Sequence, residues 1–204
     1  MPDVTSTQKG KIGEALFESY SKVSSNSHPL IFKTIVDDIL RNHRDVVERC
    51  DSFSLRIVSK SETFEDEGEE KELKYGFSKG EPEKDEQGEI KSMENVASWI
   101  ADAVIVANFS EGNMLMTFRN IEYPIEIKTG NRAELEGEQR EAFIHASQTI
   151  EGRPLLIRID IADLPEQFDL DVKKYDPERE QIRKVKESDL ITDEEVLDEK
   201  YLGY

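Results

Sequence analysis

The segment YPIEIKTG, residues 123–130, places an acid and a base two positions apart, at Glu126 and Lys128. Its alternating apolar and polar residues predict a β-strand with Ile125 and Ile127 on one face and the two charged residues on the other. Such alternate residues lie about 7 Å apart, because each residue of a strand rises about 3.3 Å. A carboxylate there can hold a hard divalent cation, and an ammonium can orient a water molecule or stabilise developing negative charge. The common alternative is the solvated face of a half-buried strand.

A metal-dependent phosphodiesterase needs a second acidic residue near the first. Asp102 is the candidate, because it opens the strongly apolar strand expected over DAVIVANF, although acids also begin strands at the surface. A hairpin turn at residues 110–113 would place Asp102 opposite a position five residues short of Glu126. We therefore expect a bulge or loop in residues 119–124, where Pro124 cannot donate a ladder hydrogen bond. In a regular meander the two acids would not pair.

Asp102 together with Glu126-Ile-Lys128 resembles the D…E-x-K motif of the PD-(D/E)XK nucleases, which have the restriction-endonuclease-like fold. The resemblance implies that Asp102 and Glu126 bind Mg²⁺ or Mn²⁺, and that the carbonyl of Ile127 adds a ligand. It also implies that Lys128 assists the attacking water. Ala101 precedes Asp102, in place of the proline after which the motif is named.

Two flanking segments resemble the same family. The segment KGKIGE has the K-G-x-x-x-E form of the opening helix of archaeal Holliday-junction resolvases, which implies that Glu14 joins the metal site. Gln139 resembles the glutamine that some of these nucleases carry on the helix after the E-x-K strand, where it would orient Lys128 or a phosphate. Taken singly, Glu14 and Gln139 would more often be solvated helix residues. The resemblance spans about residues 7–161.

Gly10 and Gly13 lie inside the first expected helix, where each glycine costs about 1 kcal/mol relative to alanine. This placement makes sense if another backbone or a phosphate approaches the helix closely. Arg132, Arg140 and Arg153 could likewise meet phosphates near the site, although ordinary surface exposure is the more common role of arginine.

The hydrophobic pattern predicts an α/β fold with a mixed central sheet flanked by helices, which is the restriction-endonuclease-like class. We expect a nuclease-like domain over residues 1–162, with a flexible acidic insertion at 61–91, and an acidic C-terminal extension over 163–204. The expected helices are 7–23, 30–49 with a break near Asn42, a short helix or turn at 93–100, and 135–149. The expected strands are 53–58, an exposed strand near 72–77, 102–109, 114–118, 123–130, 154–161 and a hairpin of 172–175 with 181–185.

The formal charge of −18 argues against nucleic acid as a partner, but its distribution weakens that argument. Residues 61–91 hold 12 acids and 5 bases, and residues 163–204 hold 14 acids and 7 bases, so each segment has a net charge of −7. The remaining chain carries only −4. Exposed charges separated by more than about 8 Å are largely screened at physiological salt, so a neutral or basic site can coexist with acidic segments.

The single cysteine, Cys50, cannot form an internal disulfide, and the chain has neither a signal-peptide core nor a long apolar run. We therefore expect a soluble cytoplasmic protein that does not enter a membrane. The function predicted from these observations is Mg²⁺- or Mn²⁺-dependent hydrolysis of DNA, and the resemblance leaves a homodimer open. The alternative is a non-catalytic module on the same fold, whose acidic segments bind a basic protein partner or mimic DNA.

Overall fold

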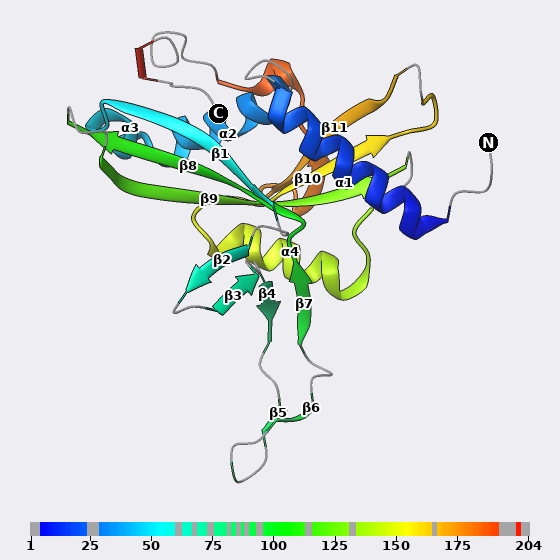
Figure 1. Cartoon of the computed structure of the whole chain (residues 1–204). Coiled ribbons are helices and arrows are strands. Elements are labelled where there is room, and N and C mark those ends of the chain that lie inside the picture. The colour runs from blue at the N-terminus through cyan, green and yellow to red at the C-terminus, as the bar shows by residue number, and fades with distance from the viewer. Residues whose placement is uncertain are drawn as a thin grey trace.

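A computed structural model describes the chain around one central sheet, with helices on both of its faces (Figure 1). The structure describes residues 5–23, 29–59, 63–66, 69–72, 76–80, 83–84, 87, 90–92, 96–112, 116–130, 134–164, 167–191 and 199–200. In spatial order the six strands are β1 (Ser52–Ser59), β8 (Ala103–Glu111), β9 (Met116–Thr129), β10 (Leu155–Asp160), β11 (Asp169–Asp176) and β12 (Gln181–Lys184). Only β9 and β10 are parallel neighbours, so the sheet is mixed and the predicted α/β class is confirmed.

Three helices cover one face of this sheet: α1 (Ser6–Val23), α2 (Pro29–Asn42) and α3 (Arg44–Arg49) (Figure 1). The helices predicted at 7–23 and 30–49, including the break near Asn42, are confirmed. Apolar side chains recur every three or four residues along the helices and meet alternate residues of the strands, so one core forms between the layers. Its fully buried members include Ile31, Ile35, Ile39, Leu55, Ile105 and Ile125.

The hairpin of β8 and β9 fixes the register of the sheet next to the E-x-K segment. Ala103 pairs with Ile125, and the pairing runs without a shift to Phe109 and Arg119. The predicted bulge or loop in residues 119–124 is therefore wrong. The one register shift lies immediately after Phe109, close to the turn, and the two strands predicted at 114–118 and 123–130 are one continuous strand.

Pro124 sits inside β9, opposite Val104, without interrupting the ladder. The carbonyl of Ile125 accepts a hydrogen bond from the N–H of Asp102 at 2.8 Å, so the backbone of Ile125 points toward β8. Since successive residues point to opposite edges, Pro124 points toward β10. The register of β10 with β9 begins only at Leu155 and Ile125, so the missing N–H removes no ladder bond.

The other face of the sheet carries α4 (Gly137–Thr149) and the short strand β7 (Ala97–Ile100) (Figure 1). The helix or turn predicted at 93–100 is wrong for the described residues 96–100. Alternate residues of β7 are buried and exposed, with Trp99 buried against α4 and Ile100 exposed, which is the period of a strand. The helix predicted at 135–149 is confirmed in α4.

The range expected as a flexible insertion contains short strands where the structure describes it. These strands are β2 (Thr63–Asp66), β3 (Glu69–Glu72), β4 (Gly76–Lys79), β5 (Glu83–Lys84) and β6 (Ile90–Ser92). β4 pairs with β7, β2 pairs with β3, and β5 pairs with β6, all antiparallel. The exposed strand expected near 72–77 overlaps the start of β4 and the end of β3.

The hairpin predicted in the C-terminal extension is confirmed as β11 and β12. These strands do not stand apart from the core, because β11 pairs with β10 and extends the central sheet. Val172, Tyr175 and Val185 are buried, so this part of the chain contributes to the packed interior. A short 3₁₀ helix, η1 (Glu187–Asp189), follows.

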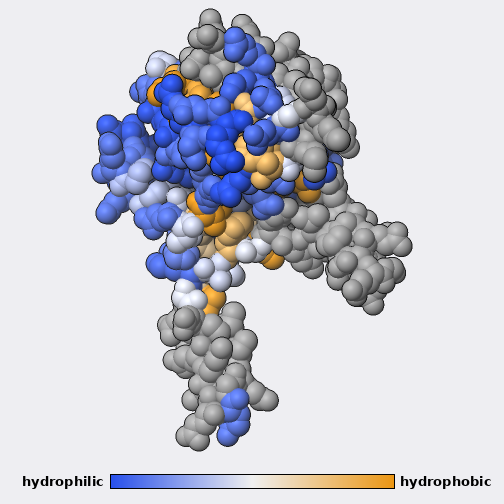
Figure 2. Space-filling model, turned by 90° about the vertical axis from the view of Figure 1, so that its left-hand side faces the viewer, coloured by the Kyte–Doolittle hydropathy of each residue, from blue (hydrophilic) through white to orange (hydrophobic). Residues whose placement is uncertain are grey.

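The surface is mainly hydrophilic, as Figure 2 shows for one face of the molecule. Among the described residues, the large hydrophobic side chains that are exposed are Ile100 and Ile191. No helix in the described part of the chain is long and apolar enough to cross a membrane.

Asp37 joins α2 to the C-terminal part of the chain. Its carboxylate is 1% exposed and accepts hydrogen bonds from Arg41 Nε at 2.7 Å, the Ile191 backbone N–H at 2.9 Å and Lys174 Nζ at 3.1 Å. Burial alone would raise the pKa of Asp37, but these donors outweigh burial and hold the pKa below its usual value of 3.8. The ionised form is therefore part of the folded structure.

α1 lies close to the end of β9 at Gly13. A Cβ on Gly13 would lie 1.9 Å from Oγ1 of Thr129 and 3.2 Å from its Cβ, so a larger residue would collide with the strand. Gly10, one turn earlier, has no heavy atom within 4 Å of a Cβ placed on it. One of the two helix glycines is thus explained by close packing, next to the strand that carries Glu126 and Lys128.

Replacing Asp37 with asparagine should lower the free energy of unfolding at pH 7 by about 2 kcal/mol, because an amide cannot neutralise Lys174 and Arg41. Since the folded pKa of Asp37 is depressed, the stabilisation is present above the unfolded pKa and is lost as the pH falls through the lower folded pKa. Urea unfolding measured from pH 7 to pH 2.5 gives the free energy of unfolding of wild type and of Asp37→Asn. The difference between the two values should shrink only below about pH 3.8. The exposed Asp45→Asn is the control, and a difference that is constant with pH would contradict this role.

Gly13→Ala should lower the free energy of unfolding by about 1–3 kcal/mol, because the added methyl group overpacks the contact with Thr129. Gly10→Ala, in the same helix but in open space, should instead raise it by up to about 1 kcal/mol. The double variant Gly13→Ala/Thr129→Ala should recover most of the loss. Chemical denaturation measures all four proteins, and equal stabilisation by both alanines would refute the close approach.

Candidate active site

Glu126 lies at the centre of the E-x-K segment as a buried acid, only 2% exposed. Its Oε1 accepts hydrogen bonds from Gln139 Nε2 at 2.6 Å and from Lys128 Nζ at 2.7 Å. Its Oε2 accepts one from Trp99 Nε1 at 2.5 Å. A carboxylate can be buried in this way because several donors replace the water that it loses.

The protonation of Glu126 reflects two opposing sets of neighbours. Burial raises the pKa of Glu126 above its usual value of 4.5, and the nearby charge of Asp102 raises it further. The hydrogen bonds from Lys128 and Trp99 act in the opposite direction but do not cancel the rise. Two carboxylates therefore sit close enough to repel each other, and additional positive charge at this point would be favourable.

Asp102 reaches this point from the residue before β8. Its backbone N–H donates to the Ile125 carbonyl at 2.8 Å, just beyond the last pair of the ladder, Ala103 with Ile125, and this bond holds Asp102 beside the E-x-K segment. Its Oδ2 accepts a hydrogen bond from the backbone N–H of Ile127 at 2.8 Å. The hairpin thus brings together the two acids that the sequence analysis selected.

Ile127 contributes its backbone to the site, while its side chain packs against the core on the face of α1, α2 and α3. The N–H and the carbonyl of one strand residue point to the same edge, so the carbonyl of Ile127 points to the side of Asp102. The pairing of β8 with β9 ends at Ala103 and Ile125, and Ile127 lies beyond it. Two carboxylates and one carbonyl can therefore face a common space.

Lys128 and Gln139 complete the polar network on the α4 side of the sheet. Lys128 Nζ donates to Gln139 Oε1 at 3.0 Å, while the amide nitrogen of Gln139 donates to Glu126. Gln139 lies in the first turn of α4, which packs on this face through the buried residues Ala142 and Phe143. One amide side chain thus fixes the positions of both charged groups of the E-x-K segment.

Trp99 is the part of the network that the sequence analysis missed. Its indole ring lies 5.0 Å from the ring of Phe77 and 5.1 Å from that of Phe143, measured between centroids, and its N–H points at Glu126. The sequence signal was weak, because Ala97, Trp99 and Ala101 are apolar at alternate positions but Ile100 between them is apolar as well. Nothing in that pattern, however, names the acid that the indole binds.

Glu14 has a different setting from the other predicted residues. It is exposed on α1, which lies on the opposite face of the sheet from α4 (Figure 1). Within the described ranges, no group of three or more His, Cys, Asp or Glu residues is placed to hold a metal ion, so Glu14 does not form such a cluster with Asp102 and Glu126. The assembled acids are a pair, and Mg²⁺ is commonly bound by one or two carboxylates together with water.

Of the arginines named in the sequence analysis, Arg153 lies away from this network. Its Nε is 3.8 Å from Asp38 Oδ1, beside a buried cluster on the α2 side of the sheet, where His43 contacts the same carboxylate at 3.9 Å. Arg140 follows Gln139 on α4. Arg132 falls outside the described residues.

Comparison with protein families agrees with this geometry. Residues 66–175, more than half of the 204-residue chain, match the family model of the PD-(D/E)XK nuclease superfamily domain. The chain belongs to this superfamily. Asp102, Glu126, Lys128 and Gln139 of this PD-(D/E)XK protein fall within the matched range, whereas Glu14 precedes it. Neither a curated protein nor a solved structure matches the chain. The mixed sheet with helices on both faces is consistent with the restriction-endonuclease-like fold predicted above.

Trp99→Phe should lower the free energy of unfolding by about 2 kcal/mol, since the buried carboxylate of Glu126 loses a donor and the ring loses area. In a Glu126→Gln background the same substitution should cost about 1 kcal/mol less, because a neutral amide depends less on the indole N–H. Urea unfolding of the four proteins forms a double-mutant cycle that isolates the hydrogen bond.

Phe143→Leu is the matched control for this cycle, because Phe143 touches the indole ring without bonding to Glu126. Its cost should be the same in both backgrounds. If the cost of Trp99→Phe were also the same in both, the indole would act through packing alone.

Proposed function

We propose that this member of the superfamily is a metal-dependent nuclease that hydrolyses phosphodiester bonds of DNA. The observation that carries the proposal is the buried network in which Glu126, Lys128 and Gln139 bond to one another, with Asp102 bonded to the backbone on either side of Glu126. These residues stand in the order of the superfamily motif.

The donor set suits a hard divalent cation. Asp102, Glu126 and the carbonyl of Ile127 offer oxygen atoms only, which favours Mg²⁺ or Mn²⁺ over softer metals. The mutual repulsion of the two acids, which helps to raise the pKa of Glu126, would be relieved by such a cation. When bound, a cation of this kind lowers the pKa of its water and neutralises charge that develops on the phosphate.

Lys128 is the residue of the chain that would meet the attacking water or a phosphate oxygen. Its ammonium is held between Glu126 Oε1 and Gln139 Oε1, at 2.7 and 3.0 Å, so its position is defined before substrate binds. If Glu126 turns to a cation, Gln139 still holds the ammonium through its amide oxygen. A pre-positioned donor of this kind stabilises charge at little cost in reorganisation.

A second function is favoured by one observation. Each oxygen of Glu126 already accepts at least one hydrogen bond, so the carboxylate has hydrogen-bond donors without any added ion. With a net charge of −18, this fits a non-catalytic module that binds a basic protein or mimics DNA. The response of the protein to metal separates the two functions.

Purified protein should cleave DNA in Mg²⁺ or Mn²⁺ and lose that activity in EDTA. Lys128→Ala and Glu126→Gln should each lower the cleavage rate about 10²–10⁴-fold, as expected for groups that act on the reacting atoms. Lys33→Ala is the matched control, because Lys33 is an ion-paired lysine of α2, on the other face of the sheet. Indifference of the rate to metal, to EDTA and to both substitutions would remove the mechanism.

Calorimetric titration with Mn²⁺ tests the same site without substrate. The nuclease should bind Mn²⁺ and lose that binding in Asp102→Asn. The non-catalytic alternative instead predicts no site-specific heat in either protein.

A further inference from the structure

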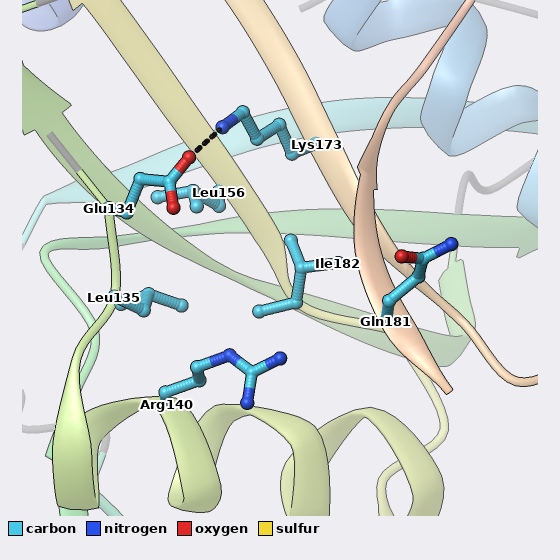
Figure 3. Close-up of a pocket in the computed structure, with 7 residues that line it drawn as sticks. All are labelled: Glu134, Leu135, Arg140, Leu156, Lys173, Gln181 and Ile182. Atoms are coloured by element: carbon cyan, nitrogen blue, oxygen red, sulfur yellow. Dashed lines mark hydrogen bonds and ion pairs between the residues drawn. The ribbon is translucent and has the colours of Figure 1, made fainter. Parts of the chain in front are cut away.

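A groove lies beside the network of Glu126, Lys128 and Gln139, which is called the catalytic network below. Both are on the same face of the sheet. It is a cavity of about 150 Å³ between α4, β10, β11 and β12. Leu135, Leu156 and Ile182 form an apolar floor, while Arg140 and Lys173 carry the positive charges at its edge (Figure 3).

Two links place this groove next to Glu126. Leu156 is the direct neighbour of Glu126 in the register of β10 with β9, and neighbouring strands are about 4.8 Å apart. Arg140 follows Gln139 on α4, and Gln139 donates to Glu126. A DNA strand bound at the catalytic network would therefore reach the groove with its adjacent nucleotide.

The two cations enter the groove from opposite sides. Arg140 reaches in from α4 and Lys173 from β11, as Figure 3 shows. Among the residues that the structure describes, no side chain pairs with the guanidinium of Arg140. Lys173 Nζ is paired with Glu134 at 3.2 Å, but the lysine side chain is 14% exposed and the glutamate side chain is 66% exposed. The glutamate can therefore swing into solvent while the ammonium stays in place.

The opposite ends of the same strands would repel a phosphate. Asp160 and Asp169 face each other in the register of β10 with β11. Asp171, two residues after Asp169, forms ion pairs with Arg158 and Lys184. These pairs neutralise the two cations at this end of the strands. A DNA backbone that runs from the catalytic network across β10 and β11 therefore meets favourable charge only on the side of Arg140 and Lys173.

We propose that this groove binds the DNA backbone phosphate adjacent to the scissile one, with Arg140 and Lys173 as its donors. The phosphate takes the place of the Glu134 carboxylate on Lys173, and the guanidinium of Arg140 binds two of its oxygens. The apolar floor contacts the neighbouring sugar. This inference rests on the proposed function, because it identifies how the substrate of that site is held.

Fluorescence anisotropy tests the groove with a labelled 20-base-pair duplex and a labelled single strand of the same length, in EDTA so that no DNA is cut. Arg140→Gln and Lys173→Gln should each weaken binding about tenfold. Each should also reduce the slope of log affinity against log salt by about one, since one phosphate contact is lost. Glu134→Gln should tighten binding severalfold, because the competing carboxylate is gone.

The matched controls are Arg44→Gln, an exposed arginine of α3, and Lys33→Gln, an ion-paired lysine of α2, both on the other face of the sheet. Both should bind DNA as wild type does. Weaker binding by Glu134→Gln would show that its pair with Lys173 is structural, and would overturn the proposal. So would wild-type affinity and salt slope in Arg140→Gln, or a wild-type protein that binds neither form of DNA.

The outcomes for the groove and for the chemistry are separable. If the cleavage rate does not respond to Lys128→Ala while Arg140→Gln loses affinity and salt dependence, the groove holds DNA and the mechanism fails. If cleavage depends on Lys128 while the groove variants bind like the controls, the nuclease stands and the groove does not hold its substrate.

Discussion

The burial of the Glu126 charge is the constraint on which the site depends. A carboxylate that is almost wholly removed from water is costly unless donors surround it, and here an ammonium, an amide and an indole N–H do so. Each donor comes from a different element, namely β9, α4 and β7. Holding one charge in place therefore requires that three elements be packed correctly, and this links the stability of the α4 layer to the geometry of the site.

The sheet supplies the second half of the arrangement. The β8–β9 pairing ends at Ala103 and so brings Asp102 beside the E-x-K segment, and the parallel pairing of β9 with β10 sets Leu156 beside Glu126. The first pairing assembles the acids, and the second gives the site a neighbouring surface. On the other face, the contact of Gly13 with Thr129 packs α1 against the same strand. The strand that carries Glu126 and Lys128 is thus held from both faces and from both edges.

Charge is distributed unevenly over this acidic protein. Most of the −18 net charge lies in two segments, while Lys128 contacts Glu126 directly and Arg140 and Lys173 line the groove on the same face. Because screening limits the reach of exposed charges to about 8 Å, the local arrangement around a bound phosphate outweighs the net charge of the whole chain.

The sequence by itself determined what local periodicity and residue type can encode. The three- and four-residue spacing of apolar positions defined α1, α2 and α4, and the alternation around Glu126 defined the strand that carries it. The motif residues from Asp102 to Gln139 could also be chosen in advance, because their chemistry and order are properties of the chain.

Only the tertiary structure decided which side chains meet. The sequence suggested a short helix or turn at 93–100, whereas pairing with β4 makes Ala97–Ile100 a strand. The bulge was expected too close to Pro124, because strand register depends on the whole hairpin and not on one residue. The indole bound to Glu126, and the closeness of Arg140 to Lys173, arise from contacts between elements distant in sequence. Such contacts leave no periodic trace, so they had to be seen in the folded chain.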